Sequence, residues 1–227
     1  SEKPLTGLTL TLCAYAAGDW LYEKTGRHPL LNPVPIAIAL IAGLLWLTDV
    51  PYTDYFEGAQ FVHFLLGPAT VALAVPLYQH LAELRKSGPA LIVGILAGSI
   101  TASGCAVGFA WLGGASTETL LSIAPKSVTA PIAMGIAEQL GGLPSLTAVL
   151  VILTGITGAL FGPLVLNLVR IKDWRARGLA LGVASHGIGT ARALQVNPIA
   201  GAFAGLAMGL NGLATAILLP LIFALVF

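Results

Sequence analysis

A lysine lies between two prolines in the stretch APKSVTAP, where Pro125 precedes Lys126 and Pro131 follows it. Proline lacks a backbone N–H and disrupts the helical ladder, so nearby main-chain groups lose their usual partners. A helix that restarts near Pro131 would aim its free amides at the break, and such amides favour an anion. Lys126 would add a full positive charge, and Ser127 and Thr129 would add hydroxyl donors. These residue types in this order predict a binding site for a small carboxylate.

A second stretch, ASHGIGTAR, holds a histidine and an arginine among glycines. Gly187 and Gly189 allow backbone conformations that other residues resist, so they predict a break in a helix. Arg192 can bind a carboxylate through two parallel hydrogen bonds. His186 titrates near neutral pH in water, so it could carry a proton that is coupled to substrate movement. The hydroxyl donors of this stretch are Ser185 and Thr190.

Structural roles compete with these functional ones. Lys126 could extend its ammonium group to the membrane interface, and the neighbouring hydroxyls could bond to the backbone. Arg192 could be an interfacial anchor, and a single histidine such as His186 is more often a structural hydrogen-bonding residue. The coincidence of a charge with a helix break favours the functional interpretation of Lys126.

The composition requires a membrane environment. Of the 227 residues, 56% are hydrophobic and 9% are charged, whereas a soluble domain carries about 25% charged residues. The net charge of +1 gives no basic field that would attract nucleic acid. The sequence contains no nucleophile–base set, Walker loop or metal-ligand spacing, so we expect neither an enzyme nor a bound cofactor or metal. Cys13 and Cys105 lie in apolar runs and are expected to be small packing residues.

The elements that must position the candidate residues are membrane helices, so the predicted fold is all-α. A membrane-spanning helix needs about 20 mostly apolar residues. About six such helices are predicted, at residues 5–21, 34–47, 61–81, 89–112, 143–169 and 198–227. Two further apolar segments, 119–140 and 178–196, are interrupted and carry the candidate site. No small-residue cleavage site follows the first run, so we expect that run to be retained as a helix.

The charges of the loops predict the topology. Residues 170–177 hold four basic side chains and one acid, whereas residues 49–60 hold three acids and no base. The positive-inside rule places the basic loops in the cytoplasm. If segment 119–140 crossed the membrane, residues 170–177 would emerge on the outside. We therefore expect segment 119–140 to enter and return on one side, and segment 178–196 to be re-entrant or broken as well.

Glycine and proline recur with a spacing of 57 residues, as at Gly98, Gly155 and Gly212. This spacing predicts a repeat in which an interrupted helix is followed by a long one, and residues 61–81 would then be a third interrupted segment. Both residue types are abundant, so chance is the alternative. Glycines four residues apart predict close helix packing, with a dimer face as the alternative. These pairs and triplets are Gly94/Gly98, Gly104/Gly108, Gly158/Gly162 and Gly201/Gly205/Gly209.

Five strings in the chain resemble the LrgB/CidB family of holin- and antiholin-like membrane proteins. They are PLLNP (29–33), GPATVALAVPLY (67–78), PKSVTAPIAM (125–134), GPLVLN (162–167) and ASHGIGTARAL (184–194). The resemblance covers nearly the whole chain and extends to the C-terminal part of the plastid glycolate/glycerate transporter. One departure is Ala130, where the family pattern has threonine. The resemblance implies one transmembrane domain over residues 1–227, with N-terminal helices in 1–60 and a transport core in 61–227.

The resemblance also implies a function. It implies transport of two- or three-carbon carboxylates such as glycolate, glycerate or pyruvate, and a separate LrgA/CidA-like partner protein. It further implies a multi-pass protein of the bacterial inner membrane, and we expect a homo-oligomer such as a dimer. The alternative is a holin-like pore or a regulator of murein hydrolases and autolysis. The residues favour a carrier, because a pore has no need of a lysine between helix breaks.

Overall fold

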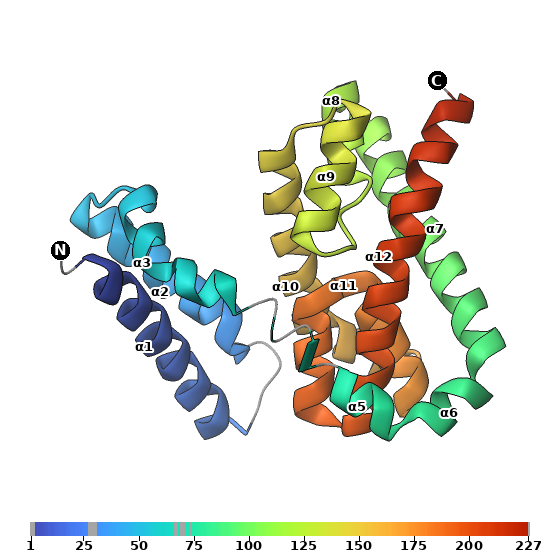
Figure 1. Cartoon of the computed structure of the whole chain (residues 1–227), viewed down its shortest axis with the longest axis horizontal. Helices are drawn as coiled ribbons and strands as arrows, with labels where there is room; N and C mark the ends of the chain where they lie inside the picture. Colours follow the sequence, from blue (N-terminus) through green and yellow to red (C-terminus); the bar gives the residue numbers. More distant parts are fainter. Residues whose placement is uncertain (1–2, 27–30, 66–67, 69–70, 73, 227) are drawn as a thin grey trace. The chain divides into compact units, whose positions relative to one another are not determined.

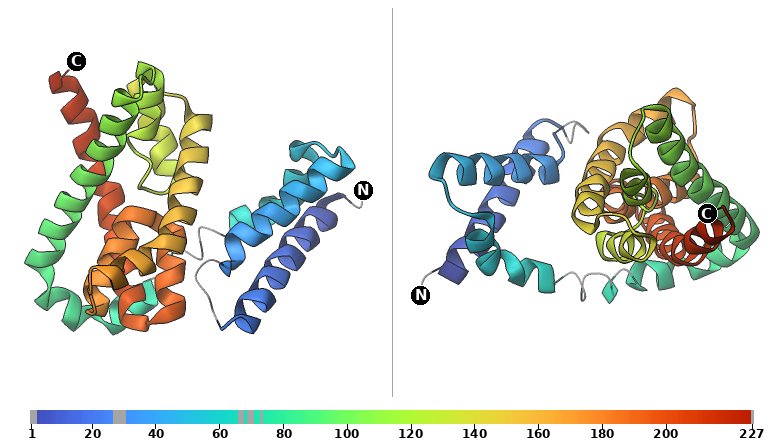
Figure 2. Two further views of the ribbon diagram at one scale, coloured as in Figure 1. Left: turned by 180° about the vertical axis from the view of Figure 1, so that it is seen from behind. Right: turned by 90° about the horizontal axis from the view of Figure 1, so that it is seen from above.

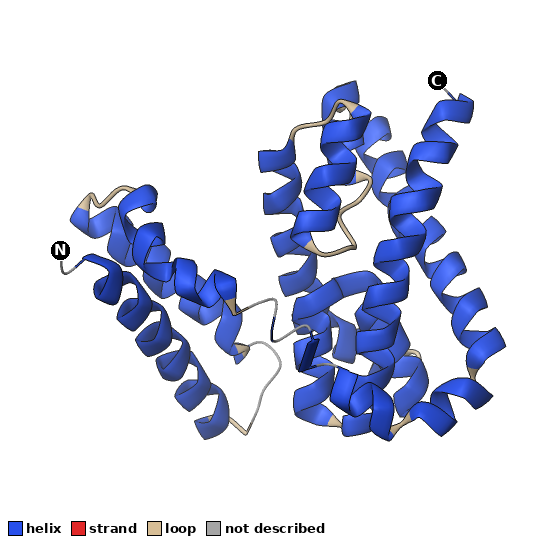
Figure 3. Cartoon of the chain, viewed as in Figure 1, coloured by secondary structure: helices blue, strands red, loops and turns tan. Residues whose placement is uncertain are grey.

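The computed structural model describes residues 3–26, 31–65, 68, 71–72 and 74–226. Within these residues the regular structure is helical and contains no strand (Figure 3). This confirms the prediction of an all-α protein. The chain forms two compact units, Ser1–Ala74 and Val75–Phe227, which are described separately.

The first unit contains three helices, α1 (Lys3–Lys24), α2 (Pro33–Thr48) and α3 (Tyr52–Phe64). Helix α2 begins where the Asn32 side chain accepts a hydrogen bond from the Val34 N–H at 2.9 Å. Helix α1 packs against both α2 and α3. The predicted spans 5–21 and 34–47 therefore lie in helices, although α2, with 16 residues, is short for a membrane crossing.

The second unit is built on three long helices, α7 (Gly88–Leu112), α10 (Pro144–Leu168) and α12 (Pro198–Val226) (Figure 1). Among the described helices, these three are long and apolar enough to cross a membrane. They correspond to the predicted spans 89–112, 143–169 and 198–227, of which residue 227 lies outside the described part. The short helices α5 (Ala74–Gln79) and α6 (Leu81–Lys86) precede α7.

The predicted span 61–81 is not described as one helix. Helix α3 ends at Phe64, residue 65 is a turn, and α5 begins at Ala74. Residues 66–67, 69–70 and 73 of this span lie outside the described residues. A further turn at His80 separates α5 from α6. About six spanning helices were predicted, and three helices in the part of the chain that the structure describes are long and apolar enough to cross a membrane.

The predicted interrupted segment 119–140 is a re-entrant hairpin. Helix α8 (Thr117–Ile123) is followed by a non-helical turn at residues 124–129, and α9 (Ala130–Leu140) then returns. The Ser122 hydroxyl accepts a hydrogen bond from the Leu143 N–H at 2.8 Å, which joins the first arm to the chain just beyond the second. Figures 1 and 2 show α8 and α9 together at one end of the unit. The segment thus folds back on itself as predicted, and its return to the side of the membrane that it entered stays a prediction.

The second interrupted segment, α11 (Trp174–Val196), is also a hairpin. Its backbone leaves helical geometry at His186, where φ is 40° and ψ is −131°. Leu181 and Ala193 pack in one cluster, although twelve residues of straight helix would separate them by about 18 Å. The chain therefore folds back at His186. The break was predicted at Gly187 and Gly189, but the backbone turns one residue earlier.

The two hairpins follow the predicted repeat. They begin at Thr117 and Trp174, which are 57 residues apart, and each is followed by a long helix. The spaced glycines Gly98, Gly155 and Gly212 lie in the long helices α7, α10 and α12, and each faces a side chain of a hairpin. Because α10 and α12 run in opposite directions (Figure 1), the two hairpins enter from opposite ends of the unit.

The basic residues Arg85 and Lys86 at the end of α6 lie at the same end of the unit as the basic stretch 170–177. Lys86, Asp173 and Arg175 line a common pocket of about 350 Å³. Asp173 accepts a hydrogen bond from the Arg175 backbone N–H at 2.8 Å and so caps the start of α11. Hydrogen bonds from the Arg175 side chain to this carboxylate lower the pKa of Asp173. The hairpin geometry thus removes the topological conflict that a crossing segment 119–140 would have created.

Cysteine labelling from one side of the membrane tests this topology. In a cysteine-free chain we expect single cysteines in place of Glu118 and Ser145 to react with an impermeant maleimide from the same side. Lys86→Cys and Lys172→Cys should react from the other side. All four positions are exposed. Labelling of Glu118→Cys and Ser145→Cys from opposite sides would contradict the re-entrant hairpin.

Candidate functional site

The turn of the first hairpin carries the predicted lysine. Pro125 is fully buried at the start of the turn, and Lys126 is half-buried, with its Nζ donating a hydrogen bond to the Ser127 Oγ at 3.2 Å. Thr129 precedes α9 in an extended conformation, and its side chain makes no capping hydrogen bond to that helix. Pro131 lies in the first turn of α9, where its missing N–H costs no helical bond. The turn therefore presents an ammonium group beside the start of a helix.

The turn of the second hairpin is held by His186. Its side chain is buried, and its Nε2 lies 2.9 Å from the Val151 carbonyl oxygen of α10. Because a carbonyl can only accept, Nε2 must carry the proton, which leaves Nδ1 as the acceptor of a neutral ring. The Thr190 hydroxyl donates a hydrogen bond to the His186 carbonyl at 2.8 Å and so stabilises the turn. The Ser185 Oγ is buried and has no hydrogen-bond partner among the residues that the structure describes.

Asn211 of α12 joins the two turns. Its Nδ2 donates to the Ser127 carbonyl and to the Val183 carbonyl, in each case at 3.3 Å. Val183 is three residues before the break in α11, so its carbonyl has lost the regular helical donor. Asn211 is buried, and within the described part of the chain its Oδ1 accepts no hydrogen bond. The two hairpins therefore meet at this side chain.

Val151 of α10 is a second junction. Its carbonyl binds His186, while its side chain packs with Val128 of the first turn. The predicted candidate residues of the two turns are thus brought together, although they are about sixty positions apart in the sequence.

Arg192 lies further along α11 than the other predicted site residues of the second hairpin, away from the turn at His186. It is buried at 6% exposure on the returning arm of α11, six residues beyond His186, which corresponds to about 9 Å of helix. Whether Arg192 and Lys126 hold one anion stays a prediction.

Glycines allow the second hairpin to fit between its neighbours. A Cβ at Gly155 would lie 2.7 Å from the His186 ring, and a Cβ at Gly158 would overlap the Ser185 hydroxyl. Gly178 and Gly182 face the main chain of Ala200 and Ala204 in α12. Leu181 and Leu179 similarly fill the spaces at further glycines of α10 and α7. Close packing within the unit therefore accounts for Gly94, Gly98, Gly158, Gly162 and Gly201, whereas Gly104, Gly108 and Gly209 meet nothing within 4 Å.

Two residues of the junction were not predicted as site residues. Asn211 is an amide in a long apolar run, and such a residue in a membrane helix commonly marks an interhelical hydrogen bond. Val151 contributes its main-chain carbonyl, and no residue type in the sequence identifies such an acceptor. Val151 lies four residues, about one helical turn, before Gly155 on α10, and the importance of this position is visible only once the hairpin is in place.

The comparisons with known proteins agree with one another. The model of the LrgB-like family matches residues 11–225. An uncharacterized protein of Haemophilus influenzae is 34% identical over 213 residues, which cover 92% of each chain. Two uncharacterized proteins of Bacillus subtilis are also similar: YwbG, 36% identical with 93% of each chain covered, and YxaC, 38% identical with 95% of this chain and 93% of its own covered. No solved structure matches the chain.

Replacement of Gly155 by alanine tests the packing of His186. The added Cβ would meet the imidazole at 2.7 Å, so we expect the variant to be less stable by about 1–3 kcal/mol. The control is Gly108→Ala, which meets no atom within 4 Å and should match or slightly exceed the wild type. Thermal unfolding in one detergent measures both. Equal melting temperatures for Gly155→Ala and the wild type would show that the His186 ring does not lie against α10.

Proposed function

The chain belongs to the LrgB-like family, and from this premise we propose that it is a membrane carrier for small monocarboxylates. The observation that supports the proposal most is the position of Lys126 in a turn that Asn211 links to a second hairpin. Substrates of two or three carbons, such as glycolate, glycerate or pyruvate, suit a site with one lysine and a few hydroxyls.

The turn of the first hairpin has the chemistry of an anion site. A charged lysine within a membrane segment costs about 2.5–3.5 kcal/mol on insertion scales, and such residues usually mark a functional site. The Lys126 ammonium donates a hydrogen bond to the Ser127 hydroxyl. A bound carboxylate would balance the positive charge of this ammonium group. The first amides of α9 and the Thr129 hydroxyl, which does not cap that helix, are further donors.

The inverted arrangement of the hairpins suits alternating access. A site between two related elements that enter from opposite ends can be opened by a shift of either element. In this proposal the carboxylate binds at the two turns, and movement of one hairpin against α12 would expose it to one side at a time. Arg192, on the returning arm of α11, would attract or guide the anion.

His186 is the proposed proton carrier. With Nε2–H donating to Val151, the neutral ring keeps Nδ1 free to take up a proton. A carboxylate bound near Lys126 would favour the protonated ring, so uptake of the anion and of a proton would be linked. A separate LrgA/CidA-like partner protein and a homodimer remain part of the proposal. The holin-like alternative would instead release large solutes without selectivity.

Removal of the lysine charge tests the proposed site. Lys126→Met keeps the length of the side chain, and we expect it to weaken anion binding by about 2–5 kcal/mol and so to abolish counterflow. Lys126→Arg should retain part of the activity. The measurement is counterflow of radiolabelled glycolate, glycerate and pyruvate by purified protein in liposomes. Lys172→Met, which removes an exposed lysine, is the matched control.

Two results would count against the carrier. Normal counterflow by Lys126→Met would exclude the lysine as a binding group. Release of an entrapped dextran along with the small anions would favour the holin-like pore. Insertion and folding of each variant are checked by size-exclusion chromatography before reconstitution, so a misfolded variant is not read as an inactive one.

Replacement of His186 by glutamine tests the proton coupling. The glutamine amide can still donate to the Val151 carbonyl, but it does not titrate. We expect His186→Gln to keep counterflow at equal pH on both sides and to lose accumulation driven by a pH gradient. Accumulation that persists in this variant would assign the coupling to another group or to another ion.

A further inference from the structure

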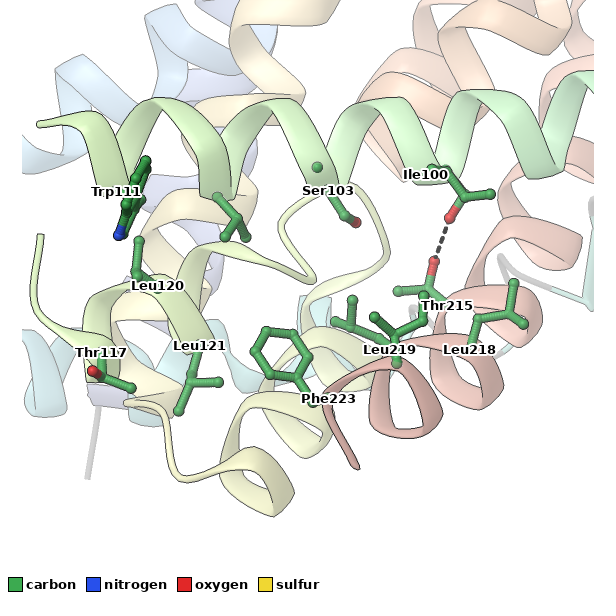
Figure 4. A pocket seen from close by; sticks show the side chains of 14 residues that line it. Ile100, Ser103, Trp111, Thr117, Leu120, Leu121, Thr215, Leu218, Leu219 and Phe223 are labelled. Atoms are coloured by element: carbon green, nitrogen blue, oxygen red, sulfur yellow. Dashed lines mark hydrogen bonds between the residues drawn. The ribbon is translucent and has the colours of Figure 1, made fainter. Parts of the chain in front are cut away.

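A second cavity lies in the same unit, away from the hairpin junction. It has a volume of about 510 Å³ and is enclosed by α7, α8 and α12. Figure 4 shows side chains of all three helices pointing into it, with Trp111 near one end and Thr215 near the other.

The lining of the cavity is apolar and carries no charge. Its innermost polar groups, the Ser99 and Thr215 hydroxyls, are 3.1 Å apart and bond to each other, as the dashed line in Figure 4 shows. Two further hydroxyls, of Ser103 and Thr117, also line it, but the cavity has no cationic side chain to bind a carboxylate, and its lining is otherwise apolar. The cavity therefore suits a hydrocarbon and is chemically distinct from the proposed anion site.

The length of the cavity matches one leaflet of a bilayer. Ser99 and Trp111 both line it and are twelve residues apart on α7, which corresponds to about 18 Å along a helix axis. Half of a hydrocarbon core that is about 30 Å thick is about 15 Å. Trp111 lies one residue before the end of α7, where tryptophan commonly marks the membrane interface. The cavity thus runs from near the middle of the membrane to one surface.

We propose that this cavity binds one acyl chain of a membrane phospholipid. Its walls α7 and α12 are both long and apolar enough to cross the membrane, so the adjacent solvent is lipid hydrocarbon. Its volume falls within the range of about 300–1,000 Å³ that is usual for small-molecule sites. The third wall is α8, whose Leu120 and Leu121 line the cavity a few residues before Lys126. The bound chain therefore packs against the arm of the hairpin that leads to the lysine.

The glycines of α7 provide a matched pair of variants. Gly104 lines the cavity, and a Cβ built on it meets no atom within 4 Å. A phenylalanine at this position would occupy the cavity without striking the backbone. Gly108, one turn later, is equally open but does not line the cavity. Gly104→Phe should therefore exclude the acyl chain, and Gly108→Phe should not.

Photolabelling with a lipid tests the proposal. The protein is reconstituted in phosphatidylglycerol that carries a diazirine at the end of one acyl chain, irradiated, digested and analysed by mass spectrometry. In the wild type and in Gly108→Phe we expect labels on Ser103, Leu218 and Leu219, which line the cavity and are not exposed on the outer surface. In Gly104→Phe these labels should fall at least about tenfold, the change in occupancy that 1.4 kcal/mol produces.

Two outcomes would overturn the assignment. Labels confined to outward side chains such as Phe109, Leu213 and Ile217, which are more than half exposed, would show only bulk lipid contact. Cavity labels of equal strength in Gly104→Phe would show that lipid reaches these residues by another route. If Gly104→Phe does not fold, Gly104→Leu fills less of the cavity and should reduce the labels in part. Because transport is not measured, failure here leaves the proposed carrier function untouched.

Discussion

Both hairpins leave main-chain carbonyls without helical donors, and Asn211 binds one carbonyl from each. In a membrane no water is available to satisfy such groups, and an unpaired one costs several kcal/mol. The Ser127 and Val183 carbonyls each lie 3.3 Å from the same amide nitrogen. A continuous helix would have no need of this amide. One polar side chain in a long apolar helix therefore serves a carbonyl of each interrupted segment, and this shared donor places the two turns together.

Close packing holds the second hairpin in this position. Gly178 and Gly182 let its first arm lie against the α12 main chain, and Gly155 and Gly158 leave room on α10 for His186 and Ser185. His186 has a positive φ, which a β-carbon disfavours, and its ring bond to Val151 helps to offset that strain. The polar turns thus lie in spaces that small residues leave open. This arrangement brings a lysine, a histidine and several hydroxyls into the interior of an otherwise apolar unit.

The sequence could predict the hairpins because local and global signals agreed. Pro125 and Pro131 mark the first interruption, and the basic residues 170–177 exclude a full crossing before them. The position of the second break could not be read from composition. Gly187 and Gly189 predicted the break at their own positions, but the backbone turns at His186, where the Val151 carbonyl and the space at Gly155 are available. The position of this break depends on the neighbouring helix α10, and no local pattern in the sequence indicates it.

Other parts of the site also required the three-dimensional structure. Asn211 was visible as an unusual amide, but its partners are 84 and 28 residues away. Thr190 looked like a substrate donor, yet its hydroxyl closes the turn on the His186 carbonyl. The span predicted at residues 61–81 was apolar enough for one helix, whereas α3, α5 and α6 divide its described residues. Hydropathy reports the environment of a segment but not its continuity.

The meeting of the two turns can be measured directly by cross-linking in the membrane. Cysteines replace Ser127 and Val183 in a cysteine-free chain, and a protease site is inserted in the exposed loop near residue 172, between them. After treatment with a short bifunctional thiol reagent and cleavage, the two fragments should remain joined, and either single-cysteine chain should separate. Fragments that separate as readily from the double variant as from the single ones would contradict a junction between the hairpins.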